Sequence, residues 1–283
     1  MTRIGIIGGS GLYRMEGIRD IREVEVKTPF GDPSDLITIG NIDGIDVAFL
    51  PRHGRGHRIS PTELPVRANI YALKSLGVEF IISVSAVGSL KEEIEPLHIV
   101  IPDQIIDRTR LRVNSFFEGF VVHVGFSEPF CPVLRKILID SAEELKIKFH
   151  DKGTYLAMEG PLFSTRAESE LYRKWGASII GMTAIPEAKL AREAEICYAT
   201  IACVTDYDCW HPSYETVTIE MVISNLAKTI NIAKDIIRIA IKKLPEKREC
   251  ICSKALENAI ITDKRLIPPE LKEKYKLLIG KYI

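Results

Sequence analysis

The sequence alternates short runs of consecutive apolar residues with longer segments in which apolar residues recur at helical spacing. Continuous apolar runs are typical of strands that are covered on both faces, and their alternation with helices indicates a three-layer α/β fold. We expect strands at residues 3–8, 36–39, 47–50, 80–84, 99–106, 154–158, 178–182 and 198–204. We expect helices at residues 64–76, 132–146, 164–175, 185–195 and 218–243.

Two features refine this fold class. Asn41-Ile42-Asp43-Gly44 has the residues of a tight hairpin turn, so the central sheet should be mixed rather than wholly parallel. Beyond Pro245 the chain becomes charged and irregular. We therefore predict one α/β domain over residues 1–245, with a mixed, twisted central sheet flanked by helices. Residues 246–283 are expected to form a tail that packs on this domain or on a neighbouring subunit.

Charge and hydropathy limit the partners of the chain. Lys and Arg together number 38, as do Asp and Glu, so no net field attracts nucleic acid or an anionic membrane. No apolar run approaches the roughly 20 residues that a membrane-spanning helix needs, and no signal peptide follows Met1. We expect a cytoplasmic protein whose partners are small molecules and copies of itself.

The six cysteines can be interpreted in more than one way. Gln occurs only at Gln104, while Ile, Lys and Glu are plentiful, which is typical of hyperthermophiles. Intracellular proteins of such organisms can carry disulfides. We predict that some of the six form disulfides, with Cys250-Ile-Cys252 either a local disulfide or free thiols. No further Cys or His stands beside this pair in the sequence, so no metal site is expected. The remaining four, expected as ordinary buried thiols, are Cys131, Cys197, Cys203 and Cys209.

Three donor-rich segments follow predicted strands. They are the glycine loop at residues 8–11, the basic segment at residues 51–58 and the hydroxyl-rich segment at residues 83–90. Backbone N–H groups, guanidinium forks and hydroxyls are all suitable donors for an oxyanion. Each segment alone also fits an ordinary turn or solvated loop. Because ligands of open α/β sheets bind beyond the carboxyl ends of the strands, we predict that the three together hold one phosphate.

A pair of carboxylates follows the last predicted strand. Asp206 and Asp208 stand two residues apart and could converge on one ligand at the turn. A carboxylic acid near a basic ring nitrogen can pass it a proton as the bond from that ring to carbon breaks. A turn or helix-capping role, or metal ligation, is the alternative for either residue.

Six short motifs, in order along residues 4 to about 240, resemble the 5′-methylthioadenosine phosphorylase family of purine-nucleoside phosphorylases. The resemblance implies a phosphorylase/hydrolase-like α/β fold and assembly as trimers or dimers of trimers. The motifs are Gly8-Gly9-Ser10-Gly11-Leu12, Pro51-Arg52-His53-Gly54, Ser85-Ala86-Val87-Gly88-Ser89-Leu90, Met158-Glu159-Gly160-Pro161, Gly181-Met182-Thr183 and Thr205-Asp206-Tyr207-Asp208-Cys209-Trp210.

The resemblance also implies a role for individual residues. It implies a phosphate site formed by Ser10, Arg52, His53, Ser85, Ala86 and Thr183. It places Met182 against the ribose, and Phe163, beside Ser164, against the base. Asp206 would face N7 of the purine and Asp208 its 6-amino group. An apolar slot for the 5′-methylthio group would be lined by Ile219, Val222 and Ile223, with His123 entering from an adjacent subunit. Catalysis would rest on Asp206, Arg52 and His53.

The implied reaction is phosphorolysis of 5′-methylthioadenosine to adenine and 5-methylthioribose 1-phosphate, a pentosyl transfer with inorganic phosphate as co-substrate and no cofactor. Two ionised aspartates, which only accept hydrogen bonds, suit a 6-amino purine better than a 6-oxo purine. Val87 stands where relatives often have cysteine, and Ser10 and Ser85 stand where threonine is frequent, so each hydroxyl is kept.

Three other functions are compatible with parts of the sequence. A broader purine-nucleoside phosphorylase would also cleave adenosine, inosine or guanosine on the same scaffold. A nicotinamide-dependent oxidoreductase would use the glycine loop, but the spacing after Gly11 does not match G-x-G-x-x-G. A non-catalytic nucleoside-binding protein would bind without releasing the base.

Overall fold

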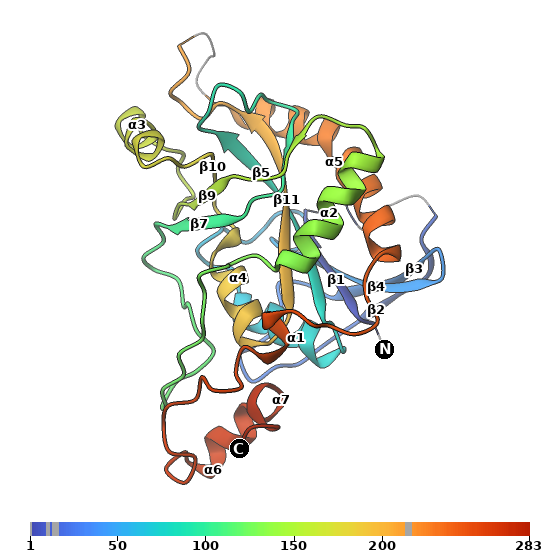
Figure 1. The fold of residues 1–283 in the computed structure, drawn as a ribbon, viewed down its shortest axis with the longest axis vertical. Helices are drawn as coiled ribbons and strands as arrows, with labels where there is room; N and C mark the ends of the chain where they lie inside the picture. The colour runs from blue at the N-terminus through green and yellow to red at the C-terminus, as the bar shows by residue number, and fades with distance from the viewer. Residues whose placement is uncertain (1, 10–11, 13–16, 213–216) are drawn as a thin grey trace.

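The computed structural model describes residues 2–9, 12, 17–212 and 217–283. Within them a twisted, mixed sheet forms the middle of the molecule (Figure 1). Its strands are β1 (Ile4–Gly8), β2 (Arg19–Val24), β3 (Ile37–Ile42), β4 (Ile45–Pro51), β5 (Phe80–Ser89), β6 (Ile99–Val100), β7 (Gln104–Asp107), β8 (Phe149–His150), β9 (Thr154–Ala157), β10 (Ile179–Gly181) and β11 (Cys197–Asp206).

Helices cover both faces of this sheet, and their apolar residues form two core clusters. The helices are α1 (Val66–Ser75), α2 (Pro132–Glu144), α3 (Arg166–Lys174), α4 (Ala184–Glu193), α5 (Ile219–Lys242), the short 3-10 turn η1 (Ile251–Lys254), α6 (Pro269–Lys274) and α7 (Lys276–Ile279). Helices α1 and α4 contribute to one cluster, and α2 and α5 contribute to the other. The expected three-layer α/β architecture with a mixed sheet is therefore confirmed.

Strand β5 organises the sheet because it has two different neighbours along one edge. Its first half pairs with β1 in parallel, and its last residues pair with β10 in antiparallel orientation. Its other edge pairs with β11 in parallel along nearly the whole strand. The path of the sheet runs β2-β3-β4-β1-β5-β10-β9-β7, and β11, β6 and β8 branch from β5. The ends of several strands consequently meet at one place.

Local signals in the sequence placed several element boundaries correctly. β3 and β4 form the expected hairpin, with Asp43 at φ 50° and Gly44 at φ 88° in its turn. Helix α3 begins with a capping box in which Thr165 and Glu168 exchange hydrogen bonds. Thr218 caps α5 by accepting a hydrogen bond from the backbone N–H of Met221. These boundaries depend on neighbouring residues only, which explains why the pattern predicts them.

Other expectations need correction. The strand expected at residues 99–106 is two strands, β6 and β7, because the chain bends at Pro102 and Pro cannot donate a ladder hydrogen bond. The strand expected to end at residue 84 continues to Ser89, because β11 and β10 pair with its final residues. Strand β2 was not predicted, since it is mostly exposed and lacks an apolar run.

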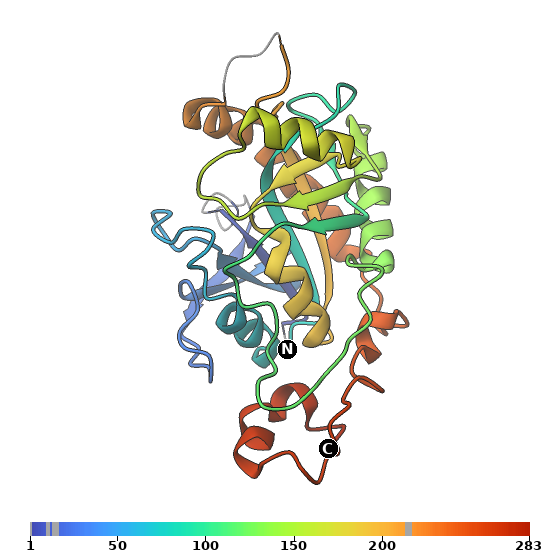
Figure 2. The ribbon, with the colours of Figure 1, turned by 90° about the vertical axis from the view of Figure 1, so that its left-hand side faces the viewer.

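The C-terminal segment after α5 runs down the molecule beside the loop that precedes α2, and both views show these two segments together (Figures 1 and 2). Val122 and Ile260 form a bridge between them. Leu256, Tyr275 and Leu278 are buried in the same core cluster as α1 and α4. In this chain the segment thus packs on its own domain. No helix in the described ranges is long and apolar enough to cross a bilayer.

Candidate active site

A cavity of about 620 Å³ opens where the strand ends meet. It brings together residues that the sequence places far apart, and Arg52 and Asp206 both line it. The predicted site residues found in its wall are Arg52, His53, Ser85, Ala86, Phe163, Met182, Thr183, Asp206, Asp208, Ile219, Val222 and Ile223. Ser10 lies outside the described residues, but its neighbour Gly9 lines the cavity. Ser164 and His123 are not among the lining residues.

The register of the sheet explains this convergence. Gly8 at the end of β1 is level with Pro51 at the end of β4, and the backbone N–H of Arg52 donates to the Gly8 carbonyl. Ser85 in β5 is level with Ala202 in β11, and Gly88 is level with Asp206. Parallel strands present their carboxyl ends at the same edge, where open α/β sheets bind ligands. Ser85 and Ala86 therefore belong to a strand and not to the loop expected after residue 84.

Two buried hydroxyls at one end of the cavity lack a partner. The side-chain oxygens of Ser85 and Thr183 have no partner of good hydrogen-bonding geometry among the described residues, although the buried Tyr155 hydroxyl lies near both. An unsatisfied buried hydroxyl costs on the order of 1–3 kcal/mol. Both side chains line the cavity, so a ligand with acceptor oxygens would satisfy them.

Arg52 reaches the cavity, but its guanidinium is mostly engaged within the protein. Its Nε donates to Glu187 Oε1 at 2.5 Å, and its terminal nitrogens donate to Glu187, Ser83 and the Val84 carbonyl. Arg52 and Glu187 are both almost fully buried. Of the five N–H donors of a guanidinium, one on Nη1 is left for a ligand. Glu187 thus occupies one side of the guanidinium, and the contact of Arg52 with phosphate, through the remaining donor, stays a prediction.

His53 is a neutral ring in this environment. Burial, with the positive charge of Arg52 next in importance, lowers the pKa of His53 to about 4. Its Nδ1 lies 2.9 Å from the Ile59 carbonyl, which can only accept, so Nδ1 carries the proton. The other ring nitrogen, Nε2, is then an acceptor. In this state Nε2 can accept a hydrogen bond from a hydroxyl of a ligand.

Asp206 differs from an ordinary surface carboxylate because it is buried and its pKa is shifted. Burial raises its pKa, while hydrogen bonds from the Thr205 hydroxyl and the Asp208 backbone N–H act in the opposite direction. Burial also raises the pKa of Asp208. Asp206 therefore keeps a proton to higher pH than an exposed aspartate does, which is the property that a general acid requires.

Gly88 makes room for this carboxylate. A Cβ placed on Gly88 would lie 2.8 Å from Asp206 Oδ1, closer than side-chain atoms normally approach, and 3.3 Å from the Asp208 backbone nitrogen. Gly88 is thus needed because it allows β5 to approach the end of β11 closely.

The first turns of α5 form an apolar wall that is open to solvent. Ile219 and Ile223 line the cavity although 57% and 62% of their surfaces are exposed. Leu226, Ala227 and Ile230 continue the wall. The Asn225 amide of α5 donates a hydrogen bond, 2.7 Å long, to the carbonyl of Thr205, the residue before Asp206.

The comparison with known families gives this arrangement a context. Residues 3–242 match the model of the phosphorylase superfamily. The chain belongs to the phosphorylase superfamily. The resemblance drawn from the six motifs is confirmed, and the fold agrees with solved members of the superfamily.

Individual members of the superfamily match the chain over nearly its full length. An S-methyl-5′-thioadenosine phosphorylase of Geobacter sulfurreducens is 57% identical, covering 99% of both chains. The crystal structure of a methylthioadenosine phosphorylase from an antarctic soil metagenomic library has a TM-score of 0.93 at 49% identity, covering 98% of this chain and 99% of that one. A variant of the adenosine/methylthioadenosine phosphorylase of Schistosoma mansoni, solved with methylthioadenosine, has a TM-score of 0.84 at 33% identity, covering 99% of this chain and 98% of that one.

This member of the superfamily also contains site residues that sequence reasoning did not find. Glu187, within α4, holds Arg52 and accepts a hydrogen bond from the Tyr198 hydroxyl at 2.9 Å. Arg112 donates to the Met182 carbonyl and, at 3.0 Å, to the Glu159 side chain, which ties together two segments of the cavity wall. Neither is part of a recognisable motif. Only a buried charge in an apolar helix would have drawn attention to Glu187.

Proposed function

We propose that the chain catalyses phosphorolysis of 5′-methylthioadenosine, giving adenine and 5-methylthioribose 1-phosphate. The observation that carries this proposal is one cavity with two unsatisfied buried hydroxyls, Ser85 and Thr183, and a buried carboxyl with a raised pKa, Asp206. Phosphate oxygens suit the hydroxyls, and a purine nitrogen suits the carboxyl. Relatives at up to 57% identity are S-methyl-5′-thioadenosine phosphorylases, which supports the same activity here.

The proposed reaction transfers the sugar from nitrogen to phosphate. A phosphate oxygen attacks C1′ of the ribose while the bond from C1′ to N9 of the base breaks. The electron pair of that bond moves onto the purine, and Asp206 donates its proton to N7. The donors around Ser85, Thr183 and the remaining Arg52 N–H hold phosphate on the opposite face of the sugar, so that positioning and preorganised charge lower the barrier.

The remaining walls suit the rest of the nucleoside. Asp208, beside Asp206, would accept a hydrogen bond from the 6-amino group, and Met182 and Phe163 would supply apolar contacts for ribose and base. Ile219, Val222 and Ile223 suit a methylthio group, since thioether and methyl groups gain from leaving water. These walls favour methylthioadenosine over adenosine as the substrate.

A substrate panel tests the function directly. The purified enzyme is incubated with methylthioadenosine, adenosine or inosine, each with and without inorganic phosphate, and with no added cofactor. We expect phosphate-dependent release of adenine, fastest from methylthioadenosine. A strong preference for inosine would favour the broader purine-nucleoside phosphorylase, and binding without base release would indicate a non-catalytic nucleoside-binding protein.

The proposed phosphate site predicts the effect of removing one hydroxyl. Thr183→Val keeps the shape of the side chain but deletes a hydroxyl from a residue that lines the cavity. A hydrogen bond to a charged group contributes about 1.5–3 kcal/mol, so the KM for phosphate should rise about tenfold or more. The KM for methylthioadenosine should change little.

Thr229→Val is a matched control for this substitution. The Thr229 hydroxyl is also buried, but it donates to carbonyls of its own helix, α5, and does not line the cavity. Steady-state kinetics at varied phosphate should place this control with the parent enzyme. An unchanged KM for phosphate in Thr183→Val would remove this hydroxyl from the phosphate site.

We also propose that the chain forms a homo-oligomer, as a trimer or dimer of trimers, and that His123 of one subunit completes the cavity of the next. His123 is exposed on the loop that runs beside the C-terminal segment, and Leu111 and Val113 of the same loop are 77% and 51% exposed. The apolar rim formed by Ile219 and Ile223 is likewise uncovered within one chain. Burial of both surfaces between subunits would remove apolar area from water.

His123→Ala is expected to raise the KM for methylthioadenosine roughly threefold to tenfold, about the contribution of one hydrogen bond or buried contact. Light scattering should show an oligomer for both the parent and this variant, because the substitution removes few contacts. A fully active monomer would contradict both the assembly and the role of His123.

The expected cytoplasmic location and thermophilic origin stay predictions.

A further inference from the structure

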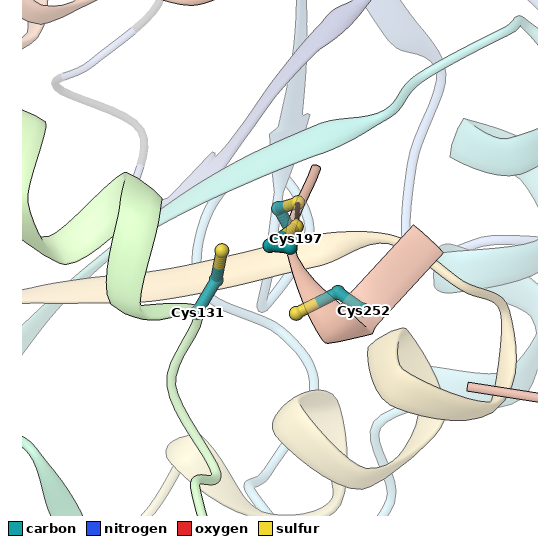
Figure 3. Close-up of side chains that lie close together, drawn as sticks. Cys131, Cys197 and Cys252 are labelled. Atoms are coloured by element: carbon teal, nitrogen blue, oxygen red, sulfur yellow. Dashed lines mark hydrogen bonds between the residues drawn. The ribbon is translucent and has the colours of Figure 1, made fainter. Parts of the chain in front are cut away.

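Four of the six cysteines gather at a place remote from the cavity. Cys131 precedes α2, Cys197 is the first residue of β11, and Cys250 and Cys252 flank the start of η1 in the C-terminal segment. Their four sulfur atoms all lie within 4.8 Å of one another. Figure 3 shows side chains from the three separate segments meeting in one space. Cys131 and Cys197, which are distant from Cys250 and Cys252 in the sequence, therefore lie beside them in the fold.

The separations fit a single tetrahedral ion. A Zn–S bond of about 2.3 Å places the four sulfurs of a tetrahedral site roughly 3.8 Å apart. The Cys197 and Cys250 sulfurs are 3.2 Å apart, whereas a disulfide bond is about 2.0 Å long. All six cysteines are free thiols, so the expected disulfides are not present in this structure. Two independent disulfides would not require all four sulfurs to be mutual neighbours, while one ion does.

The surroundings are those of a closed site. Cys131 and Cys197 are fully buried, Cys252 is 1% exposed and Cys250 is 8% exposed. A site with four protein sulfurs and no open position holds a metal for structure and not for catalysis. The cysteine positions also lie at the end of β11 opposite to Asp206, and ten residues of strand at about 3.3 Å each separate the two regions by roughly 30 Å.

A buried cation lies near the four sulfurs. The guanidinium of Arg192 is almost fully buried and acts electrostatically on the Cys252 sulfur. This cation offsets part of the negative charge that four thiolates leave around a divalent ion.

We propose that Cys131, Cys197, Cys250 and Cys252 bind one Zn²⁺ ion per chain. Each thiol loses its proton to solvent, and the four thiolates with the divalent ion form a centre of net charge −2, with no change of oxidation state. The tetrahedral set of sulfurs is typical of zinc among the divalent ions. The ion would fasten the C-terminal segment to the start of α2 and of β11, and its binding would stabilise the fold.

Metal uptake by the full-length, untagged enzyme tests the proposal. The reduced protein is dialysed against chelator, then given Zn²⁺ and assayed by elemental analysis, and in parallel given Co²⁺ and examined by absorption spectroscopy. We expect one ion per chain, the visible bands of tetrahedral Co²⁺, and a thiolate-to-cobalt charge-transfer band. Zn²⁺ should displace Co²⁺ and remove these bands. Fully reduced protein that takes up neither ion would overturn the proposal.

Variants separate this cluster from the other thiols. Cys252→Ala should lose the charge-transfer band and bind zinc at least tenfold more weakly, and its melting temperature should fall while phosphorolysis at moderate temperature continues. Cys203→Ala is the matched control, because Cys203 is a buried cysteine of β11 outside the cluster, and it should keep both bands. Mass spectrometry of the unreduced protein that finds these four cysteines paired as two disulfides, with no bound metal, would refute the site.

Discussion

Replacing Asp206 with asparagine should lower kcat/KM for methylthioadenosine by about 10²–10⁴-fold, the usual contribution of a general acid. The substitution keeps the size of the side chain but removes the acidic proton intended for N7 of the base. An asparagine amide can instead donate to a 6-oxo group, so activity on inosine relative to methylthioadenosine should increase. Initial rates on both substrates with saturating phosphate measure this change in preference. Unchanged activity would remove Asp206 from the mechanism.

The pH profile gives an independent reading of the same residue. Because burial raises the pKa of Asp206, its protonated form persists above the range of an ordinary aspartate. If catalysis needs this proton, the rate should have its full value at pH values below the raised pKa and should decline as the pH rises through that pKa. Asp206→Asn should lack this limb of the profile. Asp43→Asn, which changes an aspartate of the exposed hairpin turn, should retain both the limb and the activity.

Glu187→Ala should have the largest effect on stability. Removing one partner of a buried ion pair leaves the other charge uncompensated, which typically costs about 3–5 kcal/mol. Arg52 is only 2% exposed, and Glu187 accepts two of its hydrogen bonds. We expect the free energy of unfolding in urea to fall by about this amount. The KM for phosphate should also rise, because Arg52 would lose the partner that fixes its remaining donor toward the cavity.

Two further variants distinguish this effect from a general loss of charge. Glu144→Ala removes an exposed partner of Lys243 and should change the free energy of unfolding by less than about 1 kcal/mol. Glu187→Asp keeps the charge and should recover part of both stability and phosphate affinity. Equal destabilisation by Glu187→Ala and Glu144→Ala would show that the buried pair has no special role.

Predictions that depend on adjacent residues were accurate, whereas predictions that depend on contacts between distant segments were not. The hairpin at Asp43-Gly44 and the start of α3, which Thr165 caps, depend on a few adjacent residues, and the sequence placed both correctly to within two residues. The length of β5 was underestimated, because residues 85–89 are Ser, Ala, Gly and a single Val, a composition with little strand character. They form a strand since β11 and β10 supply hydrogen-bond partners from at least 90 residues away.

The same division applies to the site. The positions of Asp206 and Thr183 at strand ends could be inferred from motifs, and both line the cavity. The state of Arg52 could not be inferred, because its partner Glu187 stands 135 residues away and belongs to no motif. The neutral form of His53 likewise follows from its burial and from the charge of Arg52, and the position of its proton follows from the Ile59 carbonyl. The basic composition of its loop indicates neither.

By itself the sequence determined the fold class, the family and the chemical types of the site residues, because strand and helix periodicity and short motifs are written in adjacent positions. Tertiary structure alone decided which charges neutralise one another and which side chains share a space. Glu187 against Arg52, and Cys131 and Cys197 beside Cys250 and Cys252, are contacts between distant segments. Burial and mutual distance set the protonation of such groups, and both exist only after the chain has folded.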